Sequence, residues 1–175
     1  AANLQEEATA LTSETFPTAE AALAGAVDIL VEAISEDVQL RAWTYHEILK
    51  NSSIVSTLKD ANLDEKQVFQ IYYDFSEKIA DMQGYRTLAL NRGEKLGVLK
   101  VGFEHNVEKI IRFFELRFKI KNNYIHEAIQ QAVKKKIIPA MERRIRAELT
   151  ETAEDGAIQL FSDNLRNLLL IAPLK

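Results

Sequence analysis

The residues best suited to binding chemistry in this sequence are basic, and they gather on both sides of a proline. Three lysines precede Pro139 and three arginines follow it, so six positive charges fall within thirteen positions. We call them the basic ridge: Lys134, Lys135, Lys136, Arg143, Arg144 and Arg146. Such a ridge suits nucleic-acid phosphates, because each contact adds a salt-dependent share of affinity. A solvated helix face, partly neutralised by acidic side chains elsewhere, is the alternative interpretation.

The other polar residues form no catalytic or metal-binding pattern. The three histidines lie far apart in the sequence, and none has a second ligand at the spacing of a helical metal motif. The chain has neither the serine elbow of a hydrolase nor a Walker lysine. Gly93 and Gly97 resemble the glycines of a phosphate loop, but Val98 follows Gly97 where that loop requires Lys and then Ser or Thr. We therefore expect no enzyme activity, no metal, no cofactor and no small-molecule substrate.

Length and composition favour one helical body in the cytoplasm. The chain has 175 residues, of which 47% are apolar, and it contains no cysteine. This is long enough to bury a core. The apolar runs are far shorter than the roughly 18 residues of a membrane span, and the first ten residues lack the pattern of a secretory signal. The absence of cysteine suits a reducing compartment. We expect a soluble, cytoplasmic protein with no membrane partner.

The net charge of −4 conceals two halves of opposite sign. Residues 1–83 carry 5 Lys and Arg against 15 Asp and Glu, whereas residues 84–150 carry 15 against 7. Such a division suits either a surface for phosphates or two halves that attract each other within the fold. We expect an acidic helical half, 1–83, and a basic half that continues into a long helix, 84–175, to pack as one body.

Apolar side chains recur at helical spacing over most of the chain. Thr18 and Asn106 precede two of these patterns and suit N-caps. Between 51 and 63 the pattern weakens into short polar pieces, and a short helix is expected from Asp74 or Ser76 to Met82. The longer helices are expected at 18–34, 35–50, 106–120 and 123–133.

Pro139 is expected to shape the last part of the chain. Proline has no amide proton and disfavours helical geometry at the residue before it. We therefore expect a break or kink at Ile138, with the helix resuming at Pro139 as its first residue. The buried face of this last helix is expected to run from Met141 to Leu169.

The stretch GYRTLALNRGEKLGVLKV, residues 84–101, interrupts the helical pattern with three glycines. We expect a helix over 85–95, a left-handed residue at Gly97, and a strand up to Phe103 that pairs with 71–75. The charged residues of a structural motif here are expected to form charge-assisted bonds rather than touch a ligand. The motif consists of Arg86, Arg92, Gly93, Glu94 and Gly97. The predicted fold is mostly α, a multihelical bundle-like domain with one short β-strand or a small two-stranded β element near 98–103.

Three longer stretches carry a family resemblance. They are ALAGAVDILVEAISED at 22–37, YYDFSEKIADMQGYRTLALNRGEKLGVLKV at 72–101 and RRIRAELTETAEDGAIQLFSDNLRNLLLIAPLK at 143–175. The specific pieces include Asp74-Phe75-Ser76-Glu77, Arg92-Gly93-Glu94 and Asn164-Leu165-Arg166. Together the stretches resemble the bacterial transcription accessory protein (Tex) family, in the family's order. Tyr85, where the family commonly has histidine, is a departure that weakens any role built on that imidazole.

This resemblance implies a protein larger than the chain. Similar proteins begin with further helices and continue after the PLK segment into a ribonuclease H-like domain, helix-hairpin-helix repeats and a C-terminal OB-fold RNA-binding domain. The chain would then be a fragment of the N-terminal helical region, upstream of the ribonuclease H-like domain. The resemblance also implies a role in transcription, kinship to a eukaryotic elongation and histone-handling factor, and a main nucleic-acid site in a domain that this chain lacks.

Two functions follow from these observations. The first is a helical scaffold or interaction region of a transcription accessory factor that binds RNA or DNA mainly through its other domains. The second is an auxiliary nucleic-acid-binding module that uses the basic ridge at 134–146. The expected partners are nucleic acid bound through the full-length protein, the other domains of the same chain, and the transcription machinery.

Overall fold

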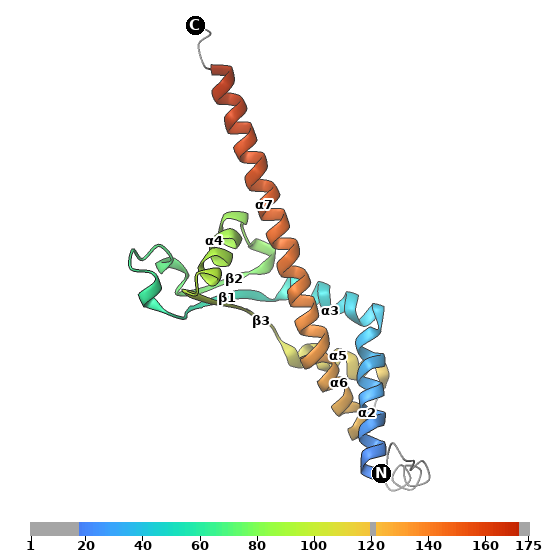
Figure 1. Cartoon of the computed structure of the whole chain (residues 1–175). Helices are drawn as coiled ribbons and strands as arrows, with labels where there is room; N and C mark the ends of the chain where they lie inside the picture. Colours follow the sequence, from blue (N-terminus) through green and yellow to red (C-terminus); the bar gives the residue numbers. More distant parts are fainter. Residues whose placement is uncertain (1–17, 120–121, 172–175) are drawn as a thin grey trace. The chain divides into compact units, whose positions relative to one another are not determined.

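The computed structural model describes residues 18–119 and 122–171 (Figure 1). Within these ranges the chain is mostly helical, as the sequence predicted. None of the described helices is long and apolar enough to cross a membrane. The PLK segment, after which the resemblance places the next domain, lies outside the described residues.

The described chain divides into two compact units, each built from two separate segments. The first unit combines 18–47 with the described part of 106–141, and the second combines 48–105 with 142–171. The change of charge at residue 84 therefore falls inside the second unit. The expected packing of the two charge halves as one body stays a prediction.

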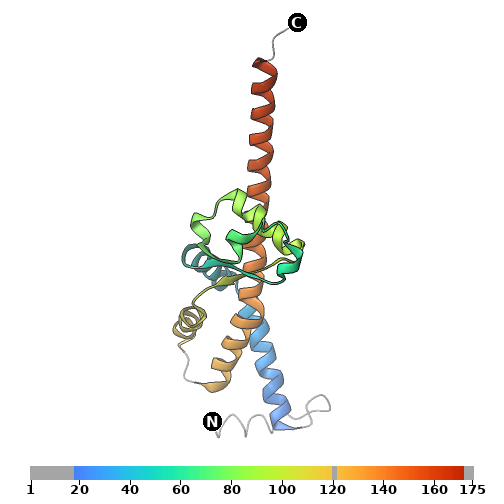
Figure 2. The ribbon, with the colours of Figure 1, turned by 90° about the vertical axis from the view of Figure 1, so that its left-hand side faces the viewer.

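Helices make up the first unit. Their apolar faces meet in a core that includes the fully buried side chains of Phe114, Ile129 and Val133. α2 lies along α6 and the π-helical turn η4 that follows it, and α5 contacts both α6 and η4 (Figure 2). The bounds are α2 (Ala19–Glu36), α5 (Val107–Phe118), α6 (Asn123–Gln131) and η4 (Ala132–Ile137).

Short polar side chains determine where these helices begin. Thr18 and Asn106 accept hydrogen bonds from backbone amides at the starts of α2 and α5, at 3.1 and 2.9 Å, and both predicted caps are confirmed. α3 (Val38–Asn51) begins later than predicted. Asp37 caps it by accepting from the Leu40 amide at 2.9 Å, whereas the hydroxyl of Ser35 donates back to a carbonyl of α2.

A seam of side-chain contacts joins α3 to α5. At its centre the rings of Trp43 and Phe113 stack with centroids 3.6 Å apart and planes 6° from parallel. One helical turn away on either side, polar groups of the two helices meet, so three successive turns are in contact. These flanking contacts are the ion pair Glu47–Lys109 and the hydrogen bond from Arg117 to Gln39.

A small antiparallel sheet lies in the second unit. Its strand order is β2-β1-β3, with β1 in the centre. Ile54 of β1 is paired with Glu77 of β2 on one side and with Phe103 of β3 on the other. α4 packs on β3. The bounds are β1 (Ser53–Leu58), β2 (Asp74–Lys78), β3 (Leu99–Glu104), α4 (Gly84–Lys95) and α7 (Ile138–Ile171).

The sheet corrects part of the predicted fold. The strand near 98–103 is confirmed as β3, but the sheet has three strands rather than one or two. β1 occupies the stretch that the sequence described as short polar pieces, and β2 replaces the helix predicted from Asp74. β3 pairs with β1 and not with 71–75. Pairing with a central strand satisfies the backbone groups of these polar segments, which local helix signals did not anticipate.

Candidate nucleic-acid interface

The three lysines of the basic ridge lie on the π-helical turn η4 in the first unit. Of the break or kink predicted at Ile138, the break is wrong, because the helix continues there. It widens instead, and the Ile138 amide donates to the carbonyl of Val133, five residues earlier. Because Pro139 lacks an amide proton and its ring crowds the carbonyl four residues back, a wider turn ahead of it lets the helix continue into α7.

All three lysines are exposed, but they differ in their partners. Lys136 forms an ion pair with Glu32 of α2. Lys135 Nζ donates to Gln131 Oε1 at 3.3 Å. Lys134 has no ionic or hydrogen-bond partner in the described part of the chain, and it borders a hollow of about 620 Å³ between α5 and α6. Lys134 is therefore the lysine most available to an anionic ligand.

The three arginines of the ridge lie on α7 in the second unit. Arg144 Nε donates to Glu148 Oε1 at 2.8 Å, one helical turn away. Arg146 is half-buried and forms an ion pair with Glu94 of α4. Arg143 is exposed, with no partner among the residues that the structure describes. The sequence places six cations close together, and within the described residues Lys134 and Arg143 are the two of them that have no protein partner.

The ion pair of Arg146 and Glu94 belongs to a network that ties α7 to α4. Asn91 Nδ2 donates to Thr150 Oγ1 at 2.8 Å, and the Thr150 hydroxyl donates to the backbone carbonyl of Arg146 at 2.8 Å. The ion pair and the bond from Asn91 connect residues more than fifty positions apart, so sequence spacing could not reveal them. Salt screens two charges that are partly withdrawn from water less than it screens an exposed pair.

Arg86 and Arg92 of the predicted structural motif have different surroundings. Arg86 forms an ion pair with Glu77 of β2, and its guanidinium lies over the Tyr85 ring at 5.5 Å from the centroid. Arg92 is exposed and has no partner in the described ranges. Arg86 therefore connects the first turn of α4 to the edge strand of the sheet, whereas Arg92 makes no such connection.

The two glycines of this motif are packed or conformationally constrained. A Cβ atom on Gly93 would lie 2.5 Å from Leu99 Cδ1 and 3.1 Å from Phe69 Cδ1. Gly93 thus lets α4 approach β3 closely. Gly97 has φ of 79°, the left-handed conformation predicted for it, which a residue with a Cβ adopts only at a cost.

A half-buried polar pair that the sequence did not reveal lies where β3 and α7 meet. His105 Nδ1 is 3.6 Å from Glu142 Oε1, too far for a hydrogen bond, and it has no hydrogen-bond partner among the described residues. Burial lowers the pKa of His105 and raises the pKa of Glu142. Both shifts favour the neutral forms of the two side chains.

Asp64 organises the loop between β1 and β2. Its buried carboxylate accepts hydrogen bonds from the amides of Val68 and Phe69 and from the hydroxyl of Tyr73, each at 2.8 Å. Burial alone would raise the pKa of Asp64, but these three hydrogen bonds outweigh it, and the pKa is lowered. A single Asp in a polar stretch gives no sequence signal of such a role.

The C-terminal part of α7 carries apolar side chains that nothing described covers. The sequence predicted a buried face up to Leu169, and this is wrong beyond Ala153, the last buried residue of the helix. In both views this part of α7 extends past the sheet and α4 of the same unit (Figure 2). The exposed apolar residues are Ile158, Leu160, Phe161, Leu165, Leu168, Leu169 and Leu170.

No group of three or more His, Cys, Asp or Glu side chains in the described ranges is arranged to hold a metal ion. Lys134, Arg143 and the exposed part of α7 are features of these ranges that are available for binding other molecules. The first two suit anions, and the third suits an apolar surface.

Comparisons with known proteins match most of the chain to one family. The model of a family described as Tex central region-like matches residues 1–161. A Bacillus subtilis protein named uncharacterized protein YdcI is 42% identical over 165 residues, which make up 90% of this chain and 23% of that protein. The transcriptional accessory protein Tex of Neisseria gonorrhoeae is 28% identical over 171 residues, covering 92% of this chain and 23% of that protein.

A human relative carries a name that refers to RNA. The human S1 RNA-binding domain-containing protein 1 is 29% identical over 142 residues, which make up 74% of this chain and 14% of that protein. The chain thus spans less than a quarter of the length of each of these relatives. Their names describe whole proteins, of which this region is one part.

Proposed function

The chain belongs to the Tex central region-like family, and on that premise we propose that it is a helical scaffold that positions the other domains of a transcription accessory factor. In this proposal the full-length protein binds nucleic acid mainly through those other domains. The region itself contributes a rigid helix and the surface on which a neighbouring domain rests.

One observation carries the proposal: the apolar side chains of α7 from Ile158 to Leu170 are exposed. Phe161 and Leu168 are 70% and 69% exposed. Several large apolar side chains with such high exposure rarely lie together on a protein surface that contacts only water. Removing apolar surface from water lowers the free energy of the protein, so such a stretch favours association with another apolar surface. The relatives are more than four times as long as the matched region, so they contain chain that can supply that surface.

The scaffold proposal is tested by hydrogen exchange of the α7 amides. The amides of 158–170 should exchange more slowly in the full-length Bacillus subtilis relative than in the isolated region, because a docked domain would protect them. Lysines at the positions that correspond to Phe161 and Leu168 should remove this protection. Lysines at the positions of the exposed Asn164 and Asn167 are the matched control. Equal exchange in both proteins would refute the scaffold role of α7.

A second candidate function is auxiliary binding of nucleic acid by the basic ridge. The observation that favours it is the availability of Lys134 and Arg143, each exposed and without a partner within the described residues. Lys136 and Arg146, in contrast, are engaged by Glu32 and Glu94. Any contribution of the ridge to affinity is therefore expected to come mostly from the two unengaged cations.

The second candidate is tested by titrating the chain with single-stranded RNA and duplex DNA at several salt concentrations. The double variant Lys134→Ala, Arg143→Ala should lower the slope of log affinity against log salt by about 1 to 2, roughly one for each lost phosphate contact. The control is Lys66→Ala, Lys95→Ala, which removes two exposed cations elsewhere. No binding at low salt, or equal slopes for both variants, would exclude the ridge as a nucleic-acid site.

Neither proposal gives this region a catalytic step. We expect the purified chain to hydrolyse neither nucleic acid nor nucleotides. Hydrolysis that persists through purification to homogeneity would overturn this expectation.

A further inference from the structure

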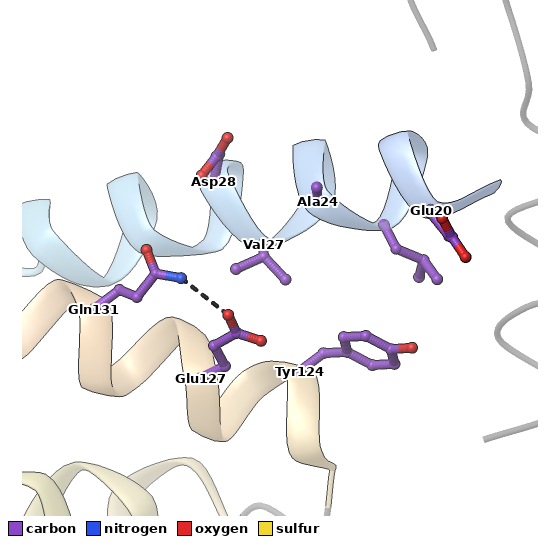
Figure 3. A pocket seen from close by; sticks show the side chains of 8 residues that line it. Glu20, Ala24, Val27, Asp28, Tyr124, Glu127 and Gln131 are labelled. Carbon is purple, nitrogen blue, oxygen red and sulfur yellow. Dashed lines mark hydrogen bonds between the residues drawn. The ribbon is translucent and has the colours of Figure 1, made fainter. Parts of the chain in front are cut away.

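A second surface, in the first unit, lies in a groove between α2 and α6 (Figure 3). The groove has a volume of about 350 Å³. Its floor is formed by Leu23, Ala24 and Val27 of α2, and Tyr124 of α6 closes one wall. In Figure 3, Val27 points from α2 toward α6, and the ring of Tyr124 extends from α6 toward the Glu20 end of α2. The floor is apolar, yet the groove opens to solvent.

Carboxylates surround this apolar floor. Glu20 and Asp28 of α2 and Glu127 of α6 line the groove, and none of its eight lining residues is Lys, Arg or His. Glu127 accepts a hydrogen bond from Gln131 at 3.2 Å. Glu20 and Asp28 have no hydrogen-bond or ionic partner in the part of the chain that the structure describes. Within the described residues, two of the three negative charges at the groove therefore have no compensating partner.

The negative charge is confined to one part of the α2 surface. Beyond Asp28 and Gln131 a neighbouring hollow of about 410 Å³ begins, and its charged lining residues are Asp28, Glu32, Lys135 and Lys136. Lys136 is paired with Glu32. Positive and negative side chains balance in this hollow, so a basic segment is favoured in the acidic groove and not beyond this end.

We propose that this groove docks an amphipathic helix of a partner protein whose apolar stripe is flanked by Lys or Arg side chains. The walls are two helices in contact, which is the geometry of helix-in-groove recognition. One turn of a helix about 10 Å across and 5.4 Å high fills roughly 400 Å³. The groove thus receives the apolar side chains of one helix face, while the carboxylates meet the cations on either side of that stripe.

Charge complementarity selects this occupant over two others. Nucleic acid is a polyanion, and the carboxylates repel it. The residues of this chain that precede α2, 1–17, carry three Glu and neither Lys nor Arg, so they do not supply the cations either. The partner segment is accordingly a basic helix that residues 1–17 do not supply. This surface is separate from α7, and the proposal does not depend on the scaffold role.

The probe for this surface is a synthetic peptide of 18 residues, the length of α2. It carries Leu at helical spacing and Lys at the flanking positions, and a matched peptide carries Glu in place of each Lys. Three exposed ion pairs together change affinity by about tenfold. The Lys peptide is therefore expected to bind at least about tenfold more tightly than the Glu peptide, with a preference that weakens as salt screens the charges.

Two variants locate the binding. Ala24→Trp fills the floor from an exposed position and should abolish binding of the Lys peptide. The triple variant Glu20→Lys, Asp28→Lys, Glu127→Lys should reverse the preference between the two peptides. A control with the same change of net charge reverses three exposed carboxylates of the second unit and should leave the preference intact: Glu104, Glu151 and Glu154.

Circular dichroism establishes that each variant keeps the helical content of the parent chain. Three outcomes would overturn the proposal: no binding of the Lys peptide, equal binding of both peptides, or a preference that the groove variants and the control change to the same extent. Association of the chain with itself that Ala24→Trp abolishes, in the absence of peptide binding, would also overturn it, because the occupant would then be a second copy.

Discussion

Replacing Gly93 with alanine is expected to destabilise the second unit. Gly93 lies in α4 and is buried against β3. The added Cβ would lie 2.5 Å from Cδ1 and 2.9 Å from Cγ of Leu99, distances that force some atoms to move. Leu99 is 1% exposed, so its side chain has little room to shift. Phe69 Cδ1, at 3.1 Å, blocks a second direction.

Two opposing effects set the size of the change that Gly93→Ala makes in the free energy of unfolding. Overpacking a filled core costs about 1–3 kcal/mol. Alanine is favoured over glycine within a helix by about 0.5–1 kcal/mol. Because Cβ would contact two atoms of one immobile side chain, the steric cost is expected in the upper part of its range. The net loss in the free energy of unfolding is therefore about 1–2 kcal/mol.

Gly156 provides a matched control on α7 of the same unit. A Cβ there meets no atom within 4 Å, so Gly156→Ala adds the higher helix propensity of alanine without a steric cost. We expect Gly156→Ala to be neutral or stabilising by up to about 1 kcal/mol. The assay is urea unfolding followed by circular dichroism. The midpoint should fall for Gly93→Ala and should stay or rise for Gly156→Ala.

Two results of the urea unfolding of Gly93→Ala and Gly156→Ala would contradict this reasoning. If Gly93→Ala unfolds at the same or a higher urea concentration than the parent chain, α4 and β3 do not pack as closely as the distances to Leu99 indicate. A fall of equal size for Gly156→Ala would show that glycine is needed at both positions for a reason other than packing.

Two further predictions concern the seam between α3 and α5 and the half-buried pair of His105 and Glu142. In a double-mutant cycle on Trp43 and Phe113, the two alanine substitutions should show a coupling of about 1 kcal/mol, and zero coupling would contradict the stacking. Because the folded pKa of His105 is below its unfolded value, the unfolded state binds more protons, and stability should fall as the pH drops below about 6.5. His105→Gln should flatten this decline between pH 7.5 and 5.5 in thermal unfolding. Glu142 has a raised pKa and opposes the decline, so Glu142→Gln should not flatten it.

The segment from Gly84 to Glu104 shows what local signals predict well. The position of α4, the left-handed φ at Gly97 and strand β3 all follow from residues a few positions apart. A glycine at a helix end and a run of Val and Leu act within one or two turns, so no distant contact is needed to interpret them. The contacts of Arg86 and Glu94 with other elements, in contrast, required the structure.

Strands β1 and β2 were not predicted, because their polar residues do not follow the sequence patterns by which strands are identified. Ser56 lies buried in β1 and its hydroxyl donates to the Tyr72 carbonyl at 2.6 Å, so a polar residue occupies a position where alternation demands an apolar one. Asp74 and Ser76 in β2 are typical helix-capping residues. Pairing with β1 determines their conformation, and that pairing spans about twenty positions.

The charges and the apolar periodicity of the sequence also do not predict which residues contact the candidate sites. The basic ridge is evident in the sequence, but the partners of Lys136 and Arg146 lie 104 and 52 positions away. Along α7 the apolar spacing is real, yet residues beyond Ala153 are exposed. Periodicity identifies the face of a helix that prefers to leave water, and it does not identify what covers that face.

The two units interleave along the chain, and this has a consequence for synthesis on the ribosome. The sheet needs only residues up to Glu104, so it can form while the chain is still emerging. The first unit joins 18–47 to the described part of 106–141, so α2 must wait, with its apolar face uncovered, until α6 and η4 have been made. Chaperone contacts with the nascent chain are therefore expected to concentrate on α2 during that interval.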